Sequence, residues 1–154
     1  MKIMVIEDRG TVCDQLVLKL EEQKWEVAVC TSTNQADATW NANKNKIDVL
    51  IFDICMSHQY LPDDLKKETH LGYITGWIWF WKKLYVNKMQ PHPFSGKKII
   101  VFSGYLDTLA VYMESEEADK AEKEFYYNHV VSVGKGNFGS YKEIIQYINE
   151  RATK

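Results

Sequence analysis

Short apolar runs alternate along this chain with longer segments in which apolar residues recur every three or four positions. The short runs predict β-strands. Five of them are found, at Lys2–Ile6, Trp25–Cys30, Ile47–Phe52, Lys98–Phe102 and Val130–Val133. The third run is almost wholly apolar, which is typical of a parallel strand that is covered on both faces of its sheet.

The longer segments predict amphipathic helices. They lie at Val12–Glu22, Asn34–Asn43, Gly72–Asn87, Thr108–Phe125 and in the closing stretch SYKEIIQYINE. Thr33 is the expected N-cap of the second helix, and Ser140 has the spacing of a capping box with Glu143. Ser57–Thr69 is polar and holds a proline, which predicts a loop or an insertion, and Gln90–Gly96 holds two prolines, which predicts a break.

Strand and helix thus alternate five times over 154 residues. With right-handed crossovers, this order predicts a single α/β domain over residues 1–154, built on a doubly wound, five-stranded parallel sheet with helices on both faces. The hydrophobic share of 45% and the charged share of 26% fit a soluble globular chain that buries its own core. No internal repeat, low-complexity tract or long linker divides the sequence.

Net charge, cysteine content and the length of the apolar runs indicate where the protein works and which partners it lacks. The formal net charge of −2 argues against binding nucleic acid through bulk electrostatics, which needs a basic patch. Cys13, Cys30 and Cys55 form no CxxC motif, as expected for reduced thiols. The N-terminal stretch carries acids where a signal peptide would be apolar, and the longest apolar run, near Trp77–Trp81, is far below the ~20 residues of a membrane span. We therefore expect a cytoplasmic protein without a membrane partner.

Polar residues follow four of the five predicted strands at their carboxyl ends. They are Glu7, Asp8, Asp53, Ser103 and Lys135. In an open α/β sheet, ligands bind beyond these ends. A single polar residue at a strand end needs no functional explanation, because the chain reaches solvent there. All five together indicate a site, because three clustered carboxylates repel one another unless a cation lies between them.

A hard divalent cation such as Mg2+ would relieve that repulsion, since it binds one or two carboxylates and retains several waters. One acid would then be free to act as a nucleophile, and aspartate forms acyl phosphates. Phosphoryl transfer needs positive charge near the moving oxygens, which a lysine and a metal supply. A hydroxyl can hydrogen-bond the phosphoryl group once it is attached.

Four stretches carry a resemblance to a known family: MVIEDRG, VLIFDICMS, IIVFSGY and VVSVGKG. With these stretches in this order, the chain from Lys2 to about Arg151 resembles the receiver domain of bacterial two-component response regulators. The resemblance implies a flavodoxin-like (βα)5 fold with strand order 2-1-3-4-5. The segment of sequence between Asp53 and Ser103 has more residues than in compact receivers, which implies an extended region after the third strand.

The resemblance further implies a stand-alone receiver that takes a phosphoryl group from a histidine kinase or a phosphotransfer protein. Asp53 corresponds to the phosphoacceptor, Ser103 to the hydroxyl that moves toward the phosphoryl group, and Lys135 to its counter-ion. An unknown downstream protein, or a second copy of the chain, would read the changed surface. Tyr105, two positions past Ser103, lies where the family controls hydrolysis, and its bulk predicts that the protein dephosphorylates itself slowly.

The metal ligands are also implied by the resemblance. Glu7 and Asp8 correspond to the acids that hold Mg2+, with Asp8 as the direct ligand and Glu7 acting through water. Asp53 itself and the backbone carbonyl of Cys55 complete the set of protein ligands.

Two departures from the family pattern support an alternative, a pseudo-receiver that acts as a protein-interaction module without phosphorylation. The family has a proline after the lysine, where this chain has Gly136, and an aromatic switch residue three positions before the lysine, where this chain has Ser132. Gly136 is expected to supply a positive φ instead. A flavin carrier of the same fold is a third hypothesis, but the acids of EDRGT would repel a flavin phosphate.

Other stretches each allow two interpretations. The insertion at residues 57–72 is either a lid beside the site or a tolerated surface loop. Trp77 and Trp81 share one helical face and Trp79 lies on another, which indicates either core packing or an exposed aromatic patch for a partner. The run ESEEADKAEKE predicts a solvated helix face with ion pairs, or a partner-binding surface. The four histidines, which show no metal spacing and are expected to be surface or structural residues, are His58, His70, His92 and His129.

Overall fold

The computed structural model describes residues 1–85, 94, 96–136 and 139–150. Its centre is a five-stranded, all-parallel sheet with strand order β2-β1-β3-β4-β5. The strands are β1 (Lys2–Ile6), β2 (Glu26–Cys30), β3 (Val49–Phe52), β4 (Lys98–Ser103) and β5 (Val130–Gly134). This is the predicted topology, and each strand begins and ends close to its predicted bounds.

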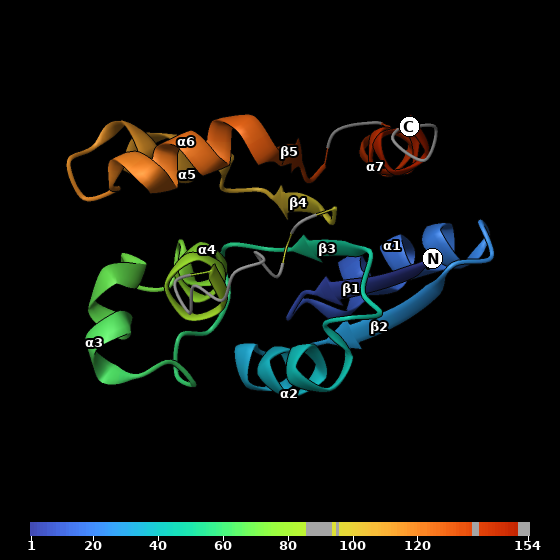
Figure 1. Cartoon of the computed structure of the whole chain (residues 1–154), viewed down its shortest axis with the longest axis horizontal. Coiled ribbons are helices and arrows are strands. Elements are labelled where there is room, and N and C mark those ends of the chain that lie inside the picture. The colour runs from blue at the N-terminus through green and yellow to red at the C-terminus, as the bar shows by residue number, and fades with distance from the viewer. Residues whose placement is uncertain (86–93, 95, 137–138, 151–154) are drawn as a thin grey trace.

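Helices of very different length connect the strands. They are α1 (Gly10–Glu21), α2 (Thr33–Asn43), α3 (Asp63–Lys66), the 3-10 helix η1 (Lys67–Thr69), α4 (Thr75–Ile78), the π-helix η2 (Trp79–Tyr85), α5 (Leu106–Glu114), α6 (Lys120–His129) and α7 (Ser140–Glu150). α1 and α7 cover one face of the sheet, whereas α2, α4, η2, α5 and α6 cover the other (Figure 1). α3 lies beyond α4, away from the sheet.

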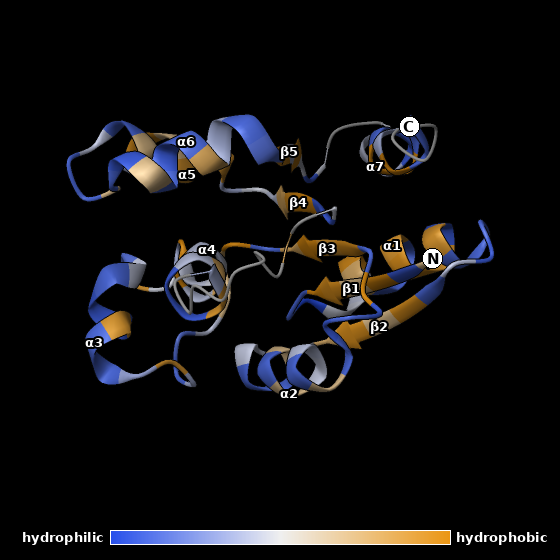
Figure 2. Cartoon of the chain, viewed as in Figure 1, coloured by the Kyte–Doolittle hydropathy of each residue, from blue (hydrophilic) through white to orange (hydrophobic). Residues whose placement is uncertain are grey.

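The sheet separates two apolar cores because successive side chains of a strand point to opposite faces. In β1, Ile3 and Val5 face α1 and α7, whereas Met4 and Ile6 face the aromatic helices on the other side. All four side chains are buried. Figure 2 shows the strands as almost uniformly hydrophobic ribbons, in contrast to the mixed helices around them. Coverage on both faces explains the continuous apolar strands of the sequence.

The aromatic segment after the insertion becomes helical later along the chain than predicted. Helix α4 begins at Thr75, not at Gly72, and continues directly into η2. The wider π-helical turn starts at Trp79 and is described as far as Tyr85. The predicted end of this helix at Asn87 lies outside the described residues, as does most of the predicted break at Gln90–Gly96.

The tryptophans of this segment belong to the core. Trp77, Trp79 and Trp81 are at most 2% exposed, so the hypothesis of an exposed aromatic patch is wrong for these side chains. The indole of Trp79, which the pattern placed on another helical face, donates a hydrogen bond of 2.8 Å to Asp37 of α2. Aromatic residues are buried on several sides of this helix because α2 packs on one flank and Phe125 of α6 on another.

The single helix predicted at Thr108–Phe125 is wrong, because the chain breaks between α5 and α6. Ser115, at the end of α5, is extended, with φ −77° and ψ 170°. Asp119 then caps α6, since its side chain accepts the N–H of Glu122 at 2.8 Å while Glu122 Oε2 accepts the N–H of Asp119 at 3.3 Å. Glu122 is fully buried, so the acidic run is not a solvated face at this position.

Two predicted caps are displaced by one residue. The N-cap of α2 is Ser32, whose Oγ accepts the N–H of Gln35 at 3.2 Å, and Thr33 is the first helical residue. In α7, Ser140 is likewise the first helical residue instead of the cap. The N–H of Glu143 donates to the carbonyl of Gly139, which precedes Ser140.

The predicted loop at Ser57–Thr69 contains the two short helices α3 and η1. Its side chains Leu61 and Thr69 are buried, so the insertion is packed against the rest of the protein. His70, the residue that follows Thr69, pairs with Glu117 in the turn between α5 and α6 at 3.0 Å. In the part of the chain that the structure describes, no helix has the length and apolar character that crossing a bilayer requires.

Candidate functional site

The predicted site residues meet at the carboxyl edge of the sheet. Glu7 and Asp8 directly follow β1, Asp53 follows β3, Ser103 ends β4, and Lys135 follows β5. Backbone hydrogen bonds extend past the strand ends and fix these positions. The N–H of Lys135, for example, donates to the carbonyl oxygen of Ser103 at 3.0 Å.

Three of these residues form an acidic cluster. Carboxylate oxygens of Glu7, Asp8 and Asp53 lie within 4.8 Å of one another. Glu7 is 2% exposed and Asp53 3% exposed, whereas Asp8 faces solvent. Among the residues that the structure describes, this is the one grouping of three or more His, Cys, Asp or Glu side chains that could hold a metal ion.

The ammonium group of Lys135 lies between the two buried acids. Its Nζ pairs with Oδ2 of Asp53 at 2.5 Å and also with Oε2 of Glu7. Burial raises the pKa of Glu7, although the hydrogen bond from Lys135 lowers it. The nearby charge of Asp53 raises the pKa of Glu7 further. One ammonium thus pairs with two of the three clustered carboxylates, and the cluster in its ionised form retains an excess of negative charge.

Asp53 is held from two sides. Its Oδ1 accepts the N–H of Cys55 at 3.2 Å, and its Oδ2 faces Lys135. Behind it, the N–H of Gly76 in α4 donates to the carbonyl of Ile54 at 2.9 Å. A Cβ at Gly76 would lie 1.9 Å from the carbonyl oxygen of Asp53. Glycine therefore lets α4 start directly against the backbone of the candidate phosphoacceptor.

Ser103 is fully buried. Its Oγ accepts the backbone N–H of Tyr105 at 3.2 Å. A serine hydroxyl can donate its own hydrogen while it accepts. Because Ser103 Oγ acts as the acceptor in its bond with Tyr105, its hydroxyl hydrogen can be donated to an acceptor at the sheet edge.

The donor set fits Mg2+. The cation prefers hard oxygen ligands and takes one or two carboxylates while it retains waters. The exposed Asp8 offers a carboxylate on the solvent side of the cluster, and Glu7 and Asp53 offer buried ones. Cys55 lies beside the cluster through its N–H bond to Asp53. Its carbonyl as a metal ligand stays a prediction.

Sequence reasoning missed two residues at this edge. Arg9 directly follows the acidic pair, and its backbone N–H donates a hydrogen bond of 3.0 Å to Oε1 of Glu7. Its place beside Asp8 was the signal that could have identified it. Gly76 had no such signal, because its close contact with Asp53 depends on how the insertion returns the chain to the sheet.

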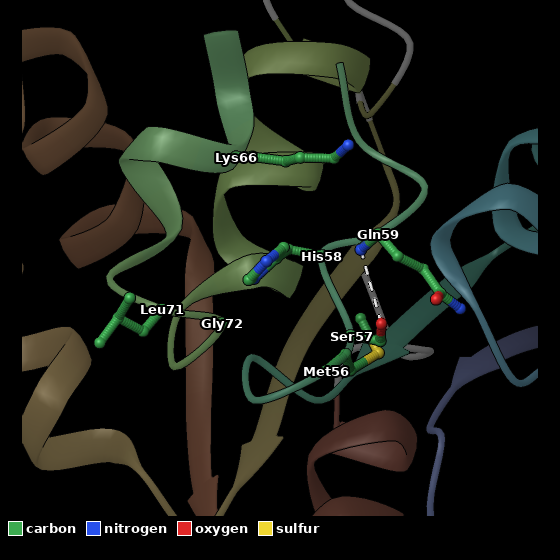
Figure 3. A pocket seen from close by; sticks show the side chains of 7 residues that line it. All are labelled: Met56, Ser57, His58, Gln59, Lys66, Leu71 and Gly72. Atoms are coloured by element: carbon green, nitrogen blue, oxygen red, sulfur yellow. Dashed lines mark hydrogen bonds between the residues drawn. The ribbon is translucent and has the colours of Figure 1, made fainter. Parts of the chain in front are cut away.

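A separate pocket of about 380 Å³ lies at the insertion (Figure 3). Its lining residues are Met56, Ser57, His58, Gln59, Lys66, Leu71 and Gly72. Lys66 is paired with Asp63 at 2.8 Å, and Leu71, which is 90% exposed, points away from the pocket's other side chains in Figure 3. The lining includes none of the three clustered acids, so this pocket is distinct from the acidic cluster.

The histidines that the structure describes are bonded or packed within the chain. His58 Nδ1 lies 3.4 Å from Thr69 Oγ1, and the ring of His129 lies 5.1 Å from that of Phe125. Together with the pairing of His70, these contacts agree with surface or structural roles. His92 lies outside the described residues.

No protein-family model matches this sequence, and no curated protein matches it. Solved structures do match. A two-component response regulator from Clostridium difficile is 15% identical with a TM-score of 0.59, covering 100% of this chain and 99% of that chain. The chemotaxis protein CheY4 of Vibrio cholerae is 14% identical with a TM-score of 0.58, covering 97% and 96%. The response regulator TrrA of Thermotoga maritima, in complex with Mg2+ and BeF, is 19% identical with a TM-score of 0.53, covering 96% and 97%. The chain therefore has the fold of response regulator receiver domains, as predicted.

Proposed function

We propose that this receiver-fold chain is a phosphoacceptor in two-component signal transduction, which takes a phosphoryl group onto Asp53. The observation that carries the proposal is the position of Lys135, whose ammonium pairs with both Asp53 and Glu7 inside a cluster of three carboxylates. A buried nucleophile beside one cation and two further acids is suited to phosphoryl transfer, which depends on positioning and charge neutralisation.

In the proposed reaction, a carboxylate oxygen of Asp53 attacks the phosphorus of a phosphohistidine on a kinase or phosphotransfer protein. The new O–P bond forms an acyl phosphate as the P–N bond to the imidazole breaks. The imidazole leaves with the electron pair of that bond and takes a proton from solvent. Lys135 stays beside the phosphoryl oxygens as a counter-ion, and Ser103 Oγ donates a hydrogen bond to them.

Mg2+, held by Asp8, Asp53 and the Cys55 carbonyl with Glu7 acting through water, would neutralise charge on the transferred group. The acidic cluster supports this assignment, because it keeps more negative charge than Lys135 balances. Slow self-dephosphorylation remains part of the proposal, since Tyr105 lies next to the site through its N–H bond to Ser103. The expected setting is the cytoplasm, with a downstream protein or a second copy of the chain as the reader of the phosphorylated surface.

Incubation with acetyl phosphate and Mg2+, followed by intact mass measurement, tests the chemistry. The wild type should gain the mass of one phosphoryl group, and Asp53→Asn should gain none. Asp14→Asn is a matched control, because it removes an exposed carboxylate on α1 and should leave the mass gain unchanged. A wild type without a gain, or a gain that survives in Asp53→Asn, would contradict the proposal.

The pseudo-receiver alternative is supported by one observation at each of the two departures from the family pattern. Ser132 of β5, at the position where an aromatic switch residue was expected, is held by the hydroxyl of Tyr126 at 2.9 Å. Gly136 has φ 84°, as predicted for a loop built without the usual proline. Titration with beryllofluoride and Mg2+ separates the two functions, because a module that works without phosphorylation should bind neither in the acidic cluster.

A further inference from the structure

The pocket at the insertion has a lining that favours a negatively charged ligand. Its volume of about 380 Å³ is large enough for a small organic molecule. The lining holds one permanent positive charge, on Lys66, and adds the polar side chains of Ser57, His58 and Gln59. No aspartate or glutamate is found in the lining that the described part of the chain provides. The pocket therefore differs in charge from the acidic cluster at the sheet edge.

The imidazole of His58 is oriented by the buried hydroxyl of Thr69. That hydroxyl donates to the carbonyl of Lys66 at 2.8 Å, and its oxygen accepts the N–H of Gly72 at 3.2 Å. His58 Nδ1 lies 3.4 Å from the same oxygen. Because the one hydroxyl hydrogen is already donated, Nδ1 is the donor in this contact. The other ring nitrogen, Nε2, has no hydrogen-bond partner among the described residues, and once protonated it can donate to a carboxylate.

The turn that closes one side of the pocket has an unusual backbone. His70, Leu71 and Gly72 have φ angles of 50°, 61° and 99°, values that glycine adopts freely and other residues rarely do. Strained backbone of this kind occurs preferentially at active sites and ligand clamps. The pairing of His70 with Glu117 at 3.0 Å helps to hold the turn. As a result, Leu71 presents an apolar side chain, 90% exposed, at the rim of the pocket.

Charge and apolar surface together specify the kind of ligand. The single charge of Lys66 matches a monoanion, and its present partner is the carboxylate of Asp63 at 2.8 Å. The Asp63 side chain is 92% exposed, and such ion pairs are weak, so a ligand that the pocket also holds by other groups can replace it. Met56 and Leu71 add apolar surface that an inorganic anion would not use. A carboxylate on a short apolar body fits both features.

The walls of the pocket lead directly into the acidic cluster. Met56 comes three residues after Asp53, and Gly72 comes four residues before Gly76, which packs against the carbonyl oxygen of Asp53. The two walls touch, since a Cβ on Gly72 would lie 3.4 Å from the carbonyl oxygen of Met56. A ligand in the pocket would therefore contact chain segments on both sides of Asp53. In Figure 3, His58 lies between Lys66 and the turn at Gly72.

We propose that this pocket binds a small organic carboxylate, with the carboxylate held by Lys66 and His58 and the apolar body lying against Met56 and Leu71. This goes beyond the proposed function and does not depend on phosphorylation of Asp53.

Titration of the full chain with sodium butyrate at constant ionic strength, followed by amide NMR spectra, tests the inference. The signals of residues 56–72 should shift, with a dissociation constant of about 1 mM for so small a ligand. Butyramide, which has the same shape without the charge, should bind about tenfold more weakly, and acetate, which lacks the apolar body, should also bind more weakly. A dissociation constant for butyrate above about 20 mM, or equal affinity for butyrate and butyramide, would overturn the inference.

Charge variants test the role of Lys66. Lys66→Gln should weaken butyrate binding about tenfold, as expected for the loss of a charge-assisted hydrogen bond. Lys67→Gln removes the same charge from an exposed neighbour and should retain the wild-type affinity. Asp63→Asn should tighten binding by up to about fivefold, because it frees the ammonium, whereas Asp64→Asn is its control. Equal losses in both lysine variants, or weaker binding in Asp63→Asn, would contradict the assignment.

Two further variants test the other contacts. Leu71→Asn, which keeps a residue that tolerates a positive φ, should weaken the binding of butyrate and leave that of acetate unchanged. His58→Phe keeps a ring without its nitrogens and should weaken the binding of both carboxylates. Wild-type affinity for butyrate in both variants would show that the ligand lies outside this pocket.

Discussion

The indole Nε1 of Trp77 donates a hydrogen bond of 2.6 Å to Oε1 of Glu122, a carboxylate that is fully buried. The hydroxyl of Tyr112 donates to the same oxygen at 3.1 Å, and the backbone N–H of Asp119 donates to Oε2. Glu122 therefore joins α4, which starts against the backbone of Asp53, to α5 and to the cap of α6. Burial raises the pKa of Glu122, although its hydrogen bonds with Trp77 and Tyr112 lower it.

The free energy of unfolding should fall with rising pH because of Glu122. A carboxyl whose pKa is raised in the folded state stabilises the protein fully below the unfolded pKa of about 4.3, and this contribution is lost as pH rises through the folded pKa. We expect Glu122→Gln, which cannot ionise, to gain in stability relative to the wild type between pH 4 and pH 8, by about 1.4 kcal/mol for each unit of the pKa shift. Urea denaturation followed by circular dichroism measures the difference.

The comparison with Glu122→Gln isolates this carboxyl from other groups, since Glu7 also has a raised pKa and titrates in both proteins. Lys82 and Tyr112 face Glu122 and are likewise unchanged. Glu124→Gln on the exposed face of α6 serves as the control and should follow the wild type at every pH. A constant difference between wild type and Glu122→Gln across the range would show that Glu122 does not change its charge.

Substitution of Gly76 should damage both stability and the site. In Gly76→Ala, the new Cβ would meet the carbonyl oxygen of Asp53 at 1.9 Å and its carbonyl carbon at 2.9 Å, so backbone must move. Such overpacking costs about 1–3 kcal/mol. We expect that loss in urea denaturation, together with weaker binding of beryllofluoride. Gly10→Ala, where nothing lies within 4 Å, is the matched control and should be neutral or slightly stabilising. Similar behaviour of the two variants would argue against the close approach.

Removal of the Lys135 charge should make the thermal stability of the protein depend more strongly on Mg2+. Lys135→Gln leaves the buried carboxylates of Glu7 and Asp53 without their shared ammonium. Breaking a buried pair from one side costs about 3–5 kcal/mol. In thermal unfolding, Mg2+ should therefore raise the midpoint of Lys135→Gln by more than that of the wild type. Lys142→Gln, which changes an exposed side chain of α7, is the control, and its unfolding midpoint should respond to Mg2+ like that of the wild type. An equal Mg2+ response in Lys135→Gln would contradict a shared cation site.

The hydrogen bond between Tyr126 and Ser132 should be measurable as a coupling energy. The hydroxyl groups are 2.9 Å apart, while the Tyr126 ring packs edge-on against Trp77 at 5.3 Å. Tyr126→Phe and Ser132→Ala should each lower the free energy of unfolding by about 1 kcal/mol. The double variant should lose little more than either single one, because both remove the same bond. Additive losses would mean that the two hydroxyls do not interact, and Tyr127→Phe on the exposed face is the control.

The sheet and the edge where the site lies could be predicted from sequence because both depend on local patterns. The apolar runs of β1, β3, β4 and β5 end in polar residues, and parallel pairing of the strands brings Glu7, Asp53 and Lys135 to the same edge, independently of the form of the connecting helices. The resemblance to receivers added the roles of these residues, and the structure contributes their contacts.

The helices between Asp53 and β5 were predicted less well, because their form depends on tertiary contacts. The burial of Trp79 follows from its bond to Asp37 on a different helix, which no spacing along the chain reveals. The break before α6 did have a local signal. Asp119 and Glu122 have capping-box spacing, but their place within an acidic run made a continuous solvated helix the simpler interpretation.

The close contact of α4 with the site has a practical consequence. Trp77 is the residue after Gly76, and its indole is fully buried and stacked at 6.4 Å on that of Trp81. Indole emission responds to small changes in the packing and polarity around the ring. If events at Asp53 move the start of α4, the native protein should report them through its own tryptophan fluorescence, without a label.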